Sequence, residues 1–132
     1  MREEFETTVE VICDRDTRYK EEAYLFVMEA LSFTQRKLKC LRHVTGEELL
    51  DGIKELLIQK FGPMTLIVLR HWGISSTEDF GNLIFNLVEH NVLSKTEDDD
   101  ISVFRNAYDF EEVFERGYHK RLARKIRRMR SI

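Results

Sequence analysis

The chain has 132 residues, a length that suits one domain with a single hydrophobic core. Hydrophobic residues make up 42% of the chain and charged residues 34%, a composition that excludes wholesale disorder. No stretch approaches the roughly 18 apolar residues that a membrane span needs. The acidic N-terminus does not resemble a signal peptide, so we expect a cytoplasmic protein.

Charge is distributed unevenly along the chain, although the net charge is only −3. Residues 1–114 carry 13 Lys/Arg and 23 Asp/Glu, a net charge of −10. Residues 115–132 carry 8 Lys/Arg and 1 Glu, a net charge of +7. Such a split is a possible signal of interaction with a partner. We therefore expect a single helical domain over residues 1–114 and a basic C-terminal tail or helix extension over residues 115–132.

Apolar residues recur at helical spacing before residue 91 and predict a series of helices. Their approximate ranges are 3–13, 19–38, 45–61, 63–72 and 77–90. Asp16 is expected to cap the start of the second helix. Thr45 with Glu48, and Ser76 with Asp79, have the spacing of capping boxes at the starts of the third and fifth helices.

The pattern changes after residue 91 to two short β-prone runs, Val92–Lys95 and Ile101–Phe104. With Thr96–Asp100 as the connecting loop, these runs predict a hairpin. Helices followed by a hairpin have the order of a winged-helix module. The predicted fold is therefore mainly α, with five to six helices and a small β-hairpin, winged-helix-like from about residue 45 to 105. This analogy of fold carries no function by itself.

The winged-helix analogy argues against the reading of a DNA sequence. A helix that reads DNA offers Arg, Lys, Asn or Gln near its N-terminus. The helix in that position begins with Thr77–Asp79, and the wing tip is Glu97–Asp100, so both places are acidic and would repel phosphates. The wing acids also lack the spacing of an EF-hand, and a solvated turn explains them more simply than a cation site.

A set of short motifs resembles a small family of bacterial proteins of similar length. The matching stretches are Tyr24-x-Phe26-Val27-x-Glu29-Ala30-Leu31, Arg42-His43-Val44 with Gly46 and Glu48-Leu49-Leu50, Phe61-Gly62-Pro63, Trp72-Gly73-Ile74, Thr77-Glu78-Asp79-Phe80-Gly81 and Phe85-Asn86-Leu87-Val88. The resemblance covers about Phe5 to Phe114 and implies a shared fold. It implies no activity, and the basic tail lies outside it.

No motif in the sequence predicts catalysis, a metal ion or a cofactor. Phosphate-binding glycine loops are absent, and no nucleophile motif accompanies His43 or His71. Cys40 and His43 could share a helical face, but a zinc site needs about four ligands and no second pair is visible. Cys13 and Cys40 are expected to be free thiols, and Trp72 a core residue rather than a ligand platform. We therefore expect a protein that is not an enzyme.

The C-terminal segment is predicted to begin a last helix near Phe110, where Asp109 and Glu112 have capping spacing. Its continuation past Gly117 is open, because glycine costs about 1 kcal/mol relative to alanine inside a helix. The candidate binding residues of the tail are Lys120, Arg121, Arg124, Lys125, Arg127, Arg128 and Arg130. If the tail is helical, Leu122, Ile126 and Met129 form an apolar stripe within this basic surface.

Such a tail could serve three kinds of partner. It could bind nucleic-acid phosphates, an acidic protein surface such as Glu97–Asp100 of this body or of a second copy, or an anionic membrane. Three modest apolar residues give little membrane insertion, and a frayed, solvated terminus is the alternative without function. We favour a binding or adaptor protein that associates with RNA or DNA, RNA above a read DNA sequence, with a protein-interaction module as the second hypothesis.

Overall fold

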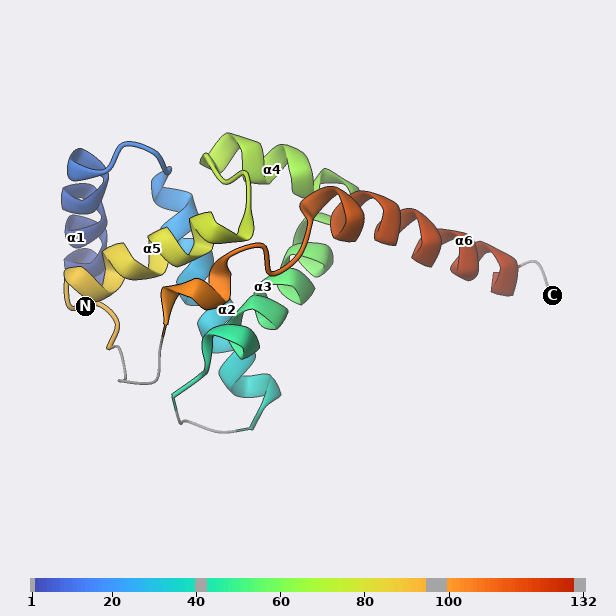
Figure 1. Ribbon diagram of the computed structural model, residues 1–132, viewed down its shortest axis with the longest axis horizontal. Coiled ribbons are helices and arrows are strands. Elements are labelled where there is room, and N and C mark those ends of the chain that lie inside the picture. The colour runs from blue at the N-terminus through green and yellow to red at the C-terminus, as the bar shows by residue number, and fades with distance from the viewer. Residues whose placement is uncertain (1, 40–42, 95–99, 130–132) are drawn as a thin grey trace.

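The computed structural model describes residues 2–39, 43–94 and 100–129. Figure 1 shows the order and arrangement of the helices. The α-helices are α1 (Arg2–Arg15), α2 (Glu21–Lys37), α3 (Gly46–Phe61), α4 (Thr65–Trp72), α5 (Thr77–Glu89) and α6 (Gly117–Met129). Three shorter elements are the 3-10 helices η1 (Gly62–Met64) and η2 (Ile101–Phe104) and the π-helix η3 (Glu111–Arg116). The ranges predicted for the first five helices agree with α1–α5 and η1 to within a few residues.

The core is built around α2, which packs against α1, α3, α4 and α5. Tyr24 and Val27 of α2, Leu57 of α3 and Phe80 of α5 are fully buried. The ring of Trp72 lies 5.3 Å from that of Phe26. A second neighbour of Trp72 is Phe61, at 5.6 Å between ring centroids. Trp72 is 7% exposed, so it is a core residue, as the sequence predicted.

The helix starts follow the predicted capping signals. The Glu48 amide donates to Thr45 Oγ1 at 3.1 Å, and the Thr45 amide donates to Glu48 Oε1 at 3.0 Å. At the start of α5, the Ser76 amide donates to the Asp79 carboxylate at 3.2 Å. These bonds satisfy amides that a helix leaves unpaired at its N-terminus. Local sequence signals therefore fix where α3 and α5 begin.

Two glycines of the helical body allow close approach of the backbone. A Cβ at Gly52 would lie 1.8 Å from Thr34 Oγ1, so the missing side chain lets α3 lie directly against α2. Gly73 ends α4 with a φ of +86°, and a Cβ there would lie 2.1 Å from the Arg18 carbonyl oxygen. At Gly73, only glycine can adopt the positive φ and leave room for the Arg18 carbonyl oxygen without strain. These contacts hold the α1–α2 turn against the end of α4.

The predicted β-hairpin and winged-helix-like architecture are wrong, because the described residues are helical and form no strand. The run that starts at Val92 instead closes α5: the Val92 amide donates to the Leu87 carbonyl at 2.9 Å, and the Asn91 amide to that of Val88 at 3.0 Å. Asn91 has a φ of +61°, the left-handed conformation of a helix C-terminal cap. Backbone groups used in this cap are not available for a strand ladder.

The second predicted strand, Ile101–Phe104, forms the 3-10 helix η2. The Asp100 carboxylate accepts the Ser102 amide at 3.0 Å, which begins the turn. Buried Thr77 of α5 donates its hydroxyl to the Phe104 carbonyl at 2.6 Å and holds the end of η2. These side-chain bonds override the β-propensity of the segment. Residues 96–99 of the predicted wing tip lie outside the described residues.

Candidate functional site

The basic tail is helical, and α6 runs from Gly117 to Met129. Gly117 has helical backbone angles, φ −62° and ψ −40°, so η3 passes into α6 without a break. Leu, Ala, Arg, Lys and Met dominate the residues that follow, and these are strong helix formers. Arg127 and Arg128 stand in the last turn, where the helix dipole favours positive charge. The structure thus continues the helix that the sequence left open at Gly117.

Six of the seven predicted binding residues lie together on one side of α6. At about 100° per residue, their positions span roughly 160° of the helix circumference. We call this the basic side, and it consists of Lys120, Arg121, Arg124, Lys125, Arg127 and Arg128. All six are exposed, and α6 contains no Asp or Glu. The seventh residue, Arg130, lies outside the described residues.

The opposite side of α6 is apolar. Leu122, Ile126 and Met129 follow one another at helical spacing, and we call them the apolar stripe. Their exposed fractions are 39%, 48% and 61%. None of the described residues of α6 is buried. The helix therefore presents both a basic and an apolar side away from the core, and Figure 1 shows it extending beyond the other helices.

The base of α6 is fixed to the body by aromatic side chains. Phe110 and Phe114 are buried, with ring centroids 5.6 Å apart. Tyr108 lies 6.1 Å from Phe114 in an edge-on arrangement and donates its hydroxyl to the Leu50 carbonyl of α3 at 3.0 Å. The Glu112 amide donates to the Asp109 carboxylate at 2.9 Å, as the predicted cap requires. The body thus supports a projecting helix from a rigid base.

A polar cluster that the sequence did not predict joins the α1–α2 turn to α5. The Asn86 side chain of α5 donates to the Tyr24 hydroxyl at 3.0 Å and to the Asp16 carboxylate at 2.9 Å. Asp16 also accepts the Arg18 guanidinium at 2.7 Å. Hydrogen bonds from Arg18 lower the pKa of Asp16, and burial raises the pKa of Tyr24 to about 12. The predicted helix cap at Asp16 is wrong: Lys20 precedes α2 without a side-chain cap.

Asp79 forms a second set of contacts beside this cluster. Its carboxylate accepts the Tyr19 hydroxyl and the Ser75 amide, the latter at 2.8 Å. Burial pushes the pKa of Asp79 upward, but hydrogen bonds from Tyr19 and the Ser75 and Ser76 amides outweigh it, so that the pKa is lowered overall. Asn82 completes the set by donating to the Tyr19 hydroxyl at 3.0 Å. These groups bond to one another, which favours a structural role.

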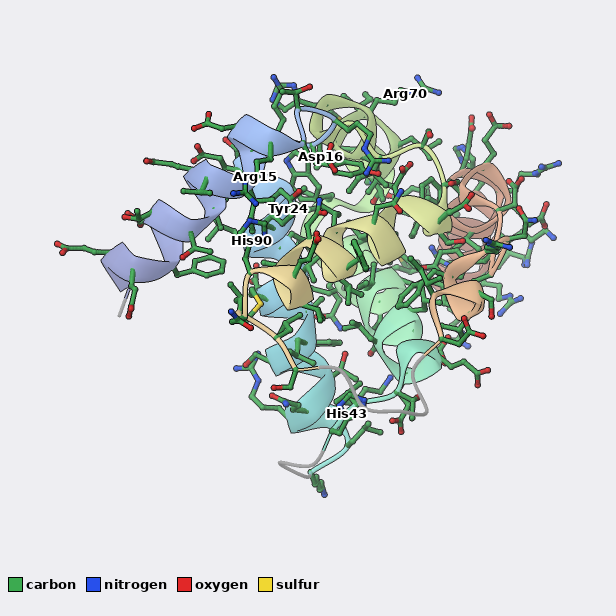
Figure 2. All side chains as sticks on the ribbon, turned by 60° about the vertical axis from the view of Figure 1, so that its left-hand side comes forward. Arg15, Asp16, Tyr24, His43, Arg70 and His90 are labelled. Carbon is green, nitrogen blue, oxygen red and sulfur yellow. The ribbon has the colours of Figure 1, made fainter. Side chains whose placement is uncertain are left out.

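His90 lies near the polar cluster at the end of α5. Its Nδ1 lies 3.0 Å from the Asn86 carbonyl oxygen, which can only accept, so Nδ1 carries the proton. The Nε2 atom is buried without a hydrogen-bond partner among the described residues. Figure 2 shows Asp16, Tyr24 and His90 gathered between the N-terminal helices and α5, with His43 well apart from them.

The described residues contain no group of three or more His, Cys, Asp or Glu that could hold a metal ion. His43 and His71 are exposed, and Cys40 lies outside the described residues. Cys13 is a free, partly buried thiol whose pKa is raised by burial and by nearby carboxylates. No described helix has the length and apolar character required to cross a membrane. The predicted pair of Cys40 with His43 therefore lies partly outside the described residues.

A mostly apolar cavity of about 470 Å³ lies between α2, α3, α5 and η2. Leu31, Leu49, Ile84 and Val103 are among its lining residues. Phe85 also lines it and is 51% exposed, so the cavity opens to the surface. No local sequence pattern marks this cavity, because its walls come from four separate elements.

No protein-family model, curated protein or solved structure matches the chain. The resemblance to a bacterial family therefore stays a prediction, and function is argued from the geometry of α6 and of the body.

Proposed function

We propose that the protein is a non-enzymatic, cytoplasmic binding protein that associates with structured RNA through the basic side of α6. The observation that supports this function is the position of α6. Six exposed Lys and Arg residues share one side of a helix that projects from an acidic body. Phosphates are the most common polyanionic partner for such a surface, and release of their counterions favours binding.

The dimensions of α6 suit contact with several phosphates at once. Its 13 residues extend over about 20 Å at 1.5 Å per residue. Arg guanidinium groups can form two parallel hydrogen bonds to one phosphate, and four of the six basic residues are Arg. The helix is already formed and its base is packed on the body. Binding therefore does not require the helix itself to fold, which reduces its entropic cost.

Contact with the nucleic-acid backbone is favoured over the reading of a DNA sequence. The basic side carries no Asn or Gln, the usual partners of adenine, and α5 begins with the acids Glu78 and Asp79. The body, with a net charge of −10 over residues 1–114, would repel a duplex that lies along it. A projecting helix can instead enter a locally widened or irregular groove, which structured RNA offers.

A non-enzymatic role agrees with the state of the titratable groups in the body. The carboxylates of Asp16 and Asp79, whose pKa values are lowered, accept hydrogen bonds from Arg18, Tyr19 and Asn86. Each of these bonds stabilises the packing of the α1–α2 turn on α5. A general acid or base needs a position from which it can reach a substrate. Both carboxylates instead form hydrogen bonds to other side chains of the body.

The test compares two triple variants that remove the same charge. The first is Arg121→Gln with Arg124→Gln and Arg127→Gln on α6; the control is Arg36→Gln with Lys39→Gln and Arg70→Gln, which are exposed on the body. Affinity for a stem-loop RNA with an internal bulge is measured by fluorescence anisotropy between 50 and 300 mM salt, where ~3 lost phosphate contacts should change the salt slope.

We expect the α6 variant to bind at least ~10-fold more weakly at low salt and with a salt slope shallower by about 2 to 3. The control variant should bind within ~2-fold of the parent chain, because its charges do not contact RNA in this proposal. Equal weakening by the two variants, or an affinity that does not change with salt, would overturn the proposal. A linear duplex DNA of the same length should bind more weakly than the bulged RNA.

A further inference from the structure

The apolar stripe of α6 is left exposed by the part of the chain that the structure describes. Leu122, Ile126 and Met129 are 39–61% exposed, and they lie opposite the basic side that RNA would occupy. They make up three of the ten large hydrophobic side chains that are exposed in the described structure. A contiguous apolar row on a projecting helix is typical of a contact surface for another molecule. RNA phosphates do not account for it.

A surface of opposite charge lies on α1 and on the first turn of α2. Residues 3–22 carry 8 Asp/Glu and 3 Lys/Arg. The exposed acids of this region are Glu3, Glu4, Glu6, Glu10, Asp14, Glu21 and Glu22. Among them stand two exposed apolar side chains, Val11 at 42% and Leu25 at 49%. We call these nine residues the acidic end.

Val11 and Leu25 are the two exposed apolar side chains of the acidic end. Val11 lies near the end of α1 and Leu25 near the start of α2, and these helices run in opposite directions. Exposed carboxylates stand nearby in both helices, Glu10 and Asp14 in α1 and Glu22 in α2. The α6 helix carries complementary groups, an apolar stripe and a basic side.

The acidic end and α6 cannot meet within one molecule. Figure 1 shows α1 and α6 at opposite ends of the longest axis, with α6 pointing away from α1. Contact therefore requires two molecules placed head to tail. Pairing of two α6 helices through their stripes would join two helices that each carry six Lys/Arg and no Asp or Glu, and their net like charge opposes this pairing.

We propose that α6 docks on the acidic end of a second copy of this chain. The apolar stripe packs near Val11 and Leu25, and Lys125, the basic residue nearest the stripe, faces the carboxylates of Glu10 and Asp14. Such a contact joins different surfaces of the two molecules, so repetition builds a ring or an open chain. This contact involves the protein alone and does not require that α6 binds RNA.

The test measures mass by sedimentation equilibrium on nuclease-treated full-length chain over a range of concentrations at 50 and 500 mM salt. One variant reverses charge in the acidic end, Glu10→Lys with Asp14→Lys. A second reverses charge on the helix, Arg124→Glu with Arg127→Glu. The matched control, Glu47→Lys with Asp51→Lys, makes the first variant's change of charge on exposed positions of α3.

We expect the parent chain and the control to gain mass with concentration at 50 mM salt and to approach the monomer mass at 500 mM. Each of the other two variants alone should stay monomeric. An equal mixture of both should associate again, because the unchanged α6 of the first variant can dock on the unchanged acidic end of the second, and the two reversed surfaces also complement each other. A parent chain that is monomeric throughout would overturn the proposal. Association that survives Glu10→Lys with Asp14→Lys, or that the control also abolishes, would overturn it equally.

Discussion

The helical body and α6 differ in the contacts that their side chains make. In the body, buried residues such as Tyr24 and Phe80 pack on all sides, and charged groups bond across elements, as Lys60 of α3 does with Glu29 of α2 at 2.7 Å. In α6, none of the described residues is buried, and the six basic side chains face outward. Stability therefore resides in the body, and we propose that binding resides in α6. Each prediction below compares a change in one region with a matched change in the other.

The largest expected difference concerns apolar truncation. Phe80→Ala should lower the free energy of unfolding by about 3–5 kcal/mol, because Phe80 is fully buried and its loss leaves a cavity. Leu122→Ala on α6 should change it by less than about 0.5 kcal/mol, because Leu122 is 39% exposed on an outer surface. Urea denaturation followed by circular dichroism measures both. A loss above 1 kcal/mol for Leu122→Ala would show that α6 is part of the core.

Two glycine substitutions should change the free energy of unfolding by smaller amounts, and in opposite directions. Gly52→Ala should destabilise the protein by about 1–3 kcal/mol, since the new Cβ would lie 1.8 Å from Thr34 Oγ1. Gly117→Ala should stabilise the η3–α6 junction by about 0.5–1 kcal/mol, because Gly117 has helical angles and its nearest side-chain neighbour is the flexible end of Arg121, at 3.3 Å. Thermal unfolding of the two variants measures both effects, and a lower melting temperature for Gly117→Ala would contradict this account of α6.

Acid should weaken the body. The pKa of Asp79 is lowered in the folded protein, so its carboxylate contributes stability that is present above the unfolded pKa of about 3.9 and is lost as the pH falls further, through the lower pKa of the folded state. Asp79→Asn should cost about 1–2 kcal/mol at neutral pH. Below about pH 5, the free energy of unfolding should also fall less steeply for Asp79→Asn than for the parent chain.

Two measurements distinguish an effect on the body from an effect on α6. Urea midpoints between pH 7 and pH 3 report the body, and a parallel fall of the parent and Asp79→Asn curves would contradict the role of this carboxylate. RNA affinity of the same two proteins at neutral pH reports α6.

The sequence predicted the elements whose signals are local. Thr45 with Glu48 fixed the start of α3, and apolar spacing fixed α5. The hairpin was wrong because β-propensity at Val92 and Ile101–Phe104 is a weak local preference. The α5 cap at Asn91 and the long-range bond from Thr77 to Phe104 overrode it. Long-range contacts of this kind leave no periodic pattern in the chain.

The same distinction applies to the candidate site. The basic residues of α6 could be identified from the sequence, because charge and spacing within one segment define them. The contacts of Asn86 with Asp16 and Tyr24 could not, because they join residues that are 62–70 positions apart. The side on which α6 leaves the body was also hidden, since it depends on the packing of Tyr108, Phe110 and Phe114.

The central claim, that α6 binds while the body supports it, is tested most directly by mapping the contact surface residue by residue. Backbone amide signals of the full chain are followed by nuclear magnetic resonance during titration with the bulged stem-loop RNA at low salt. The account predicts that the largest shifts fall on residues 117–129 and reverse at high salt. Shifts that gather on the body, at the start of α5 or around the cavity at Phe85, with α6 unchanged, would contradict it.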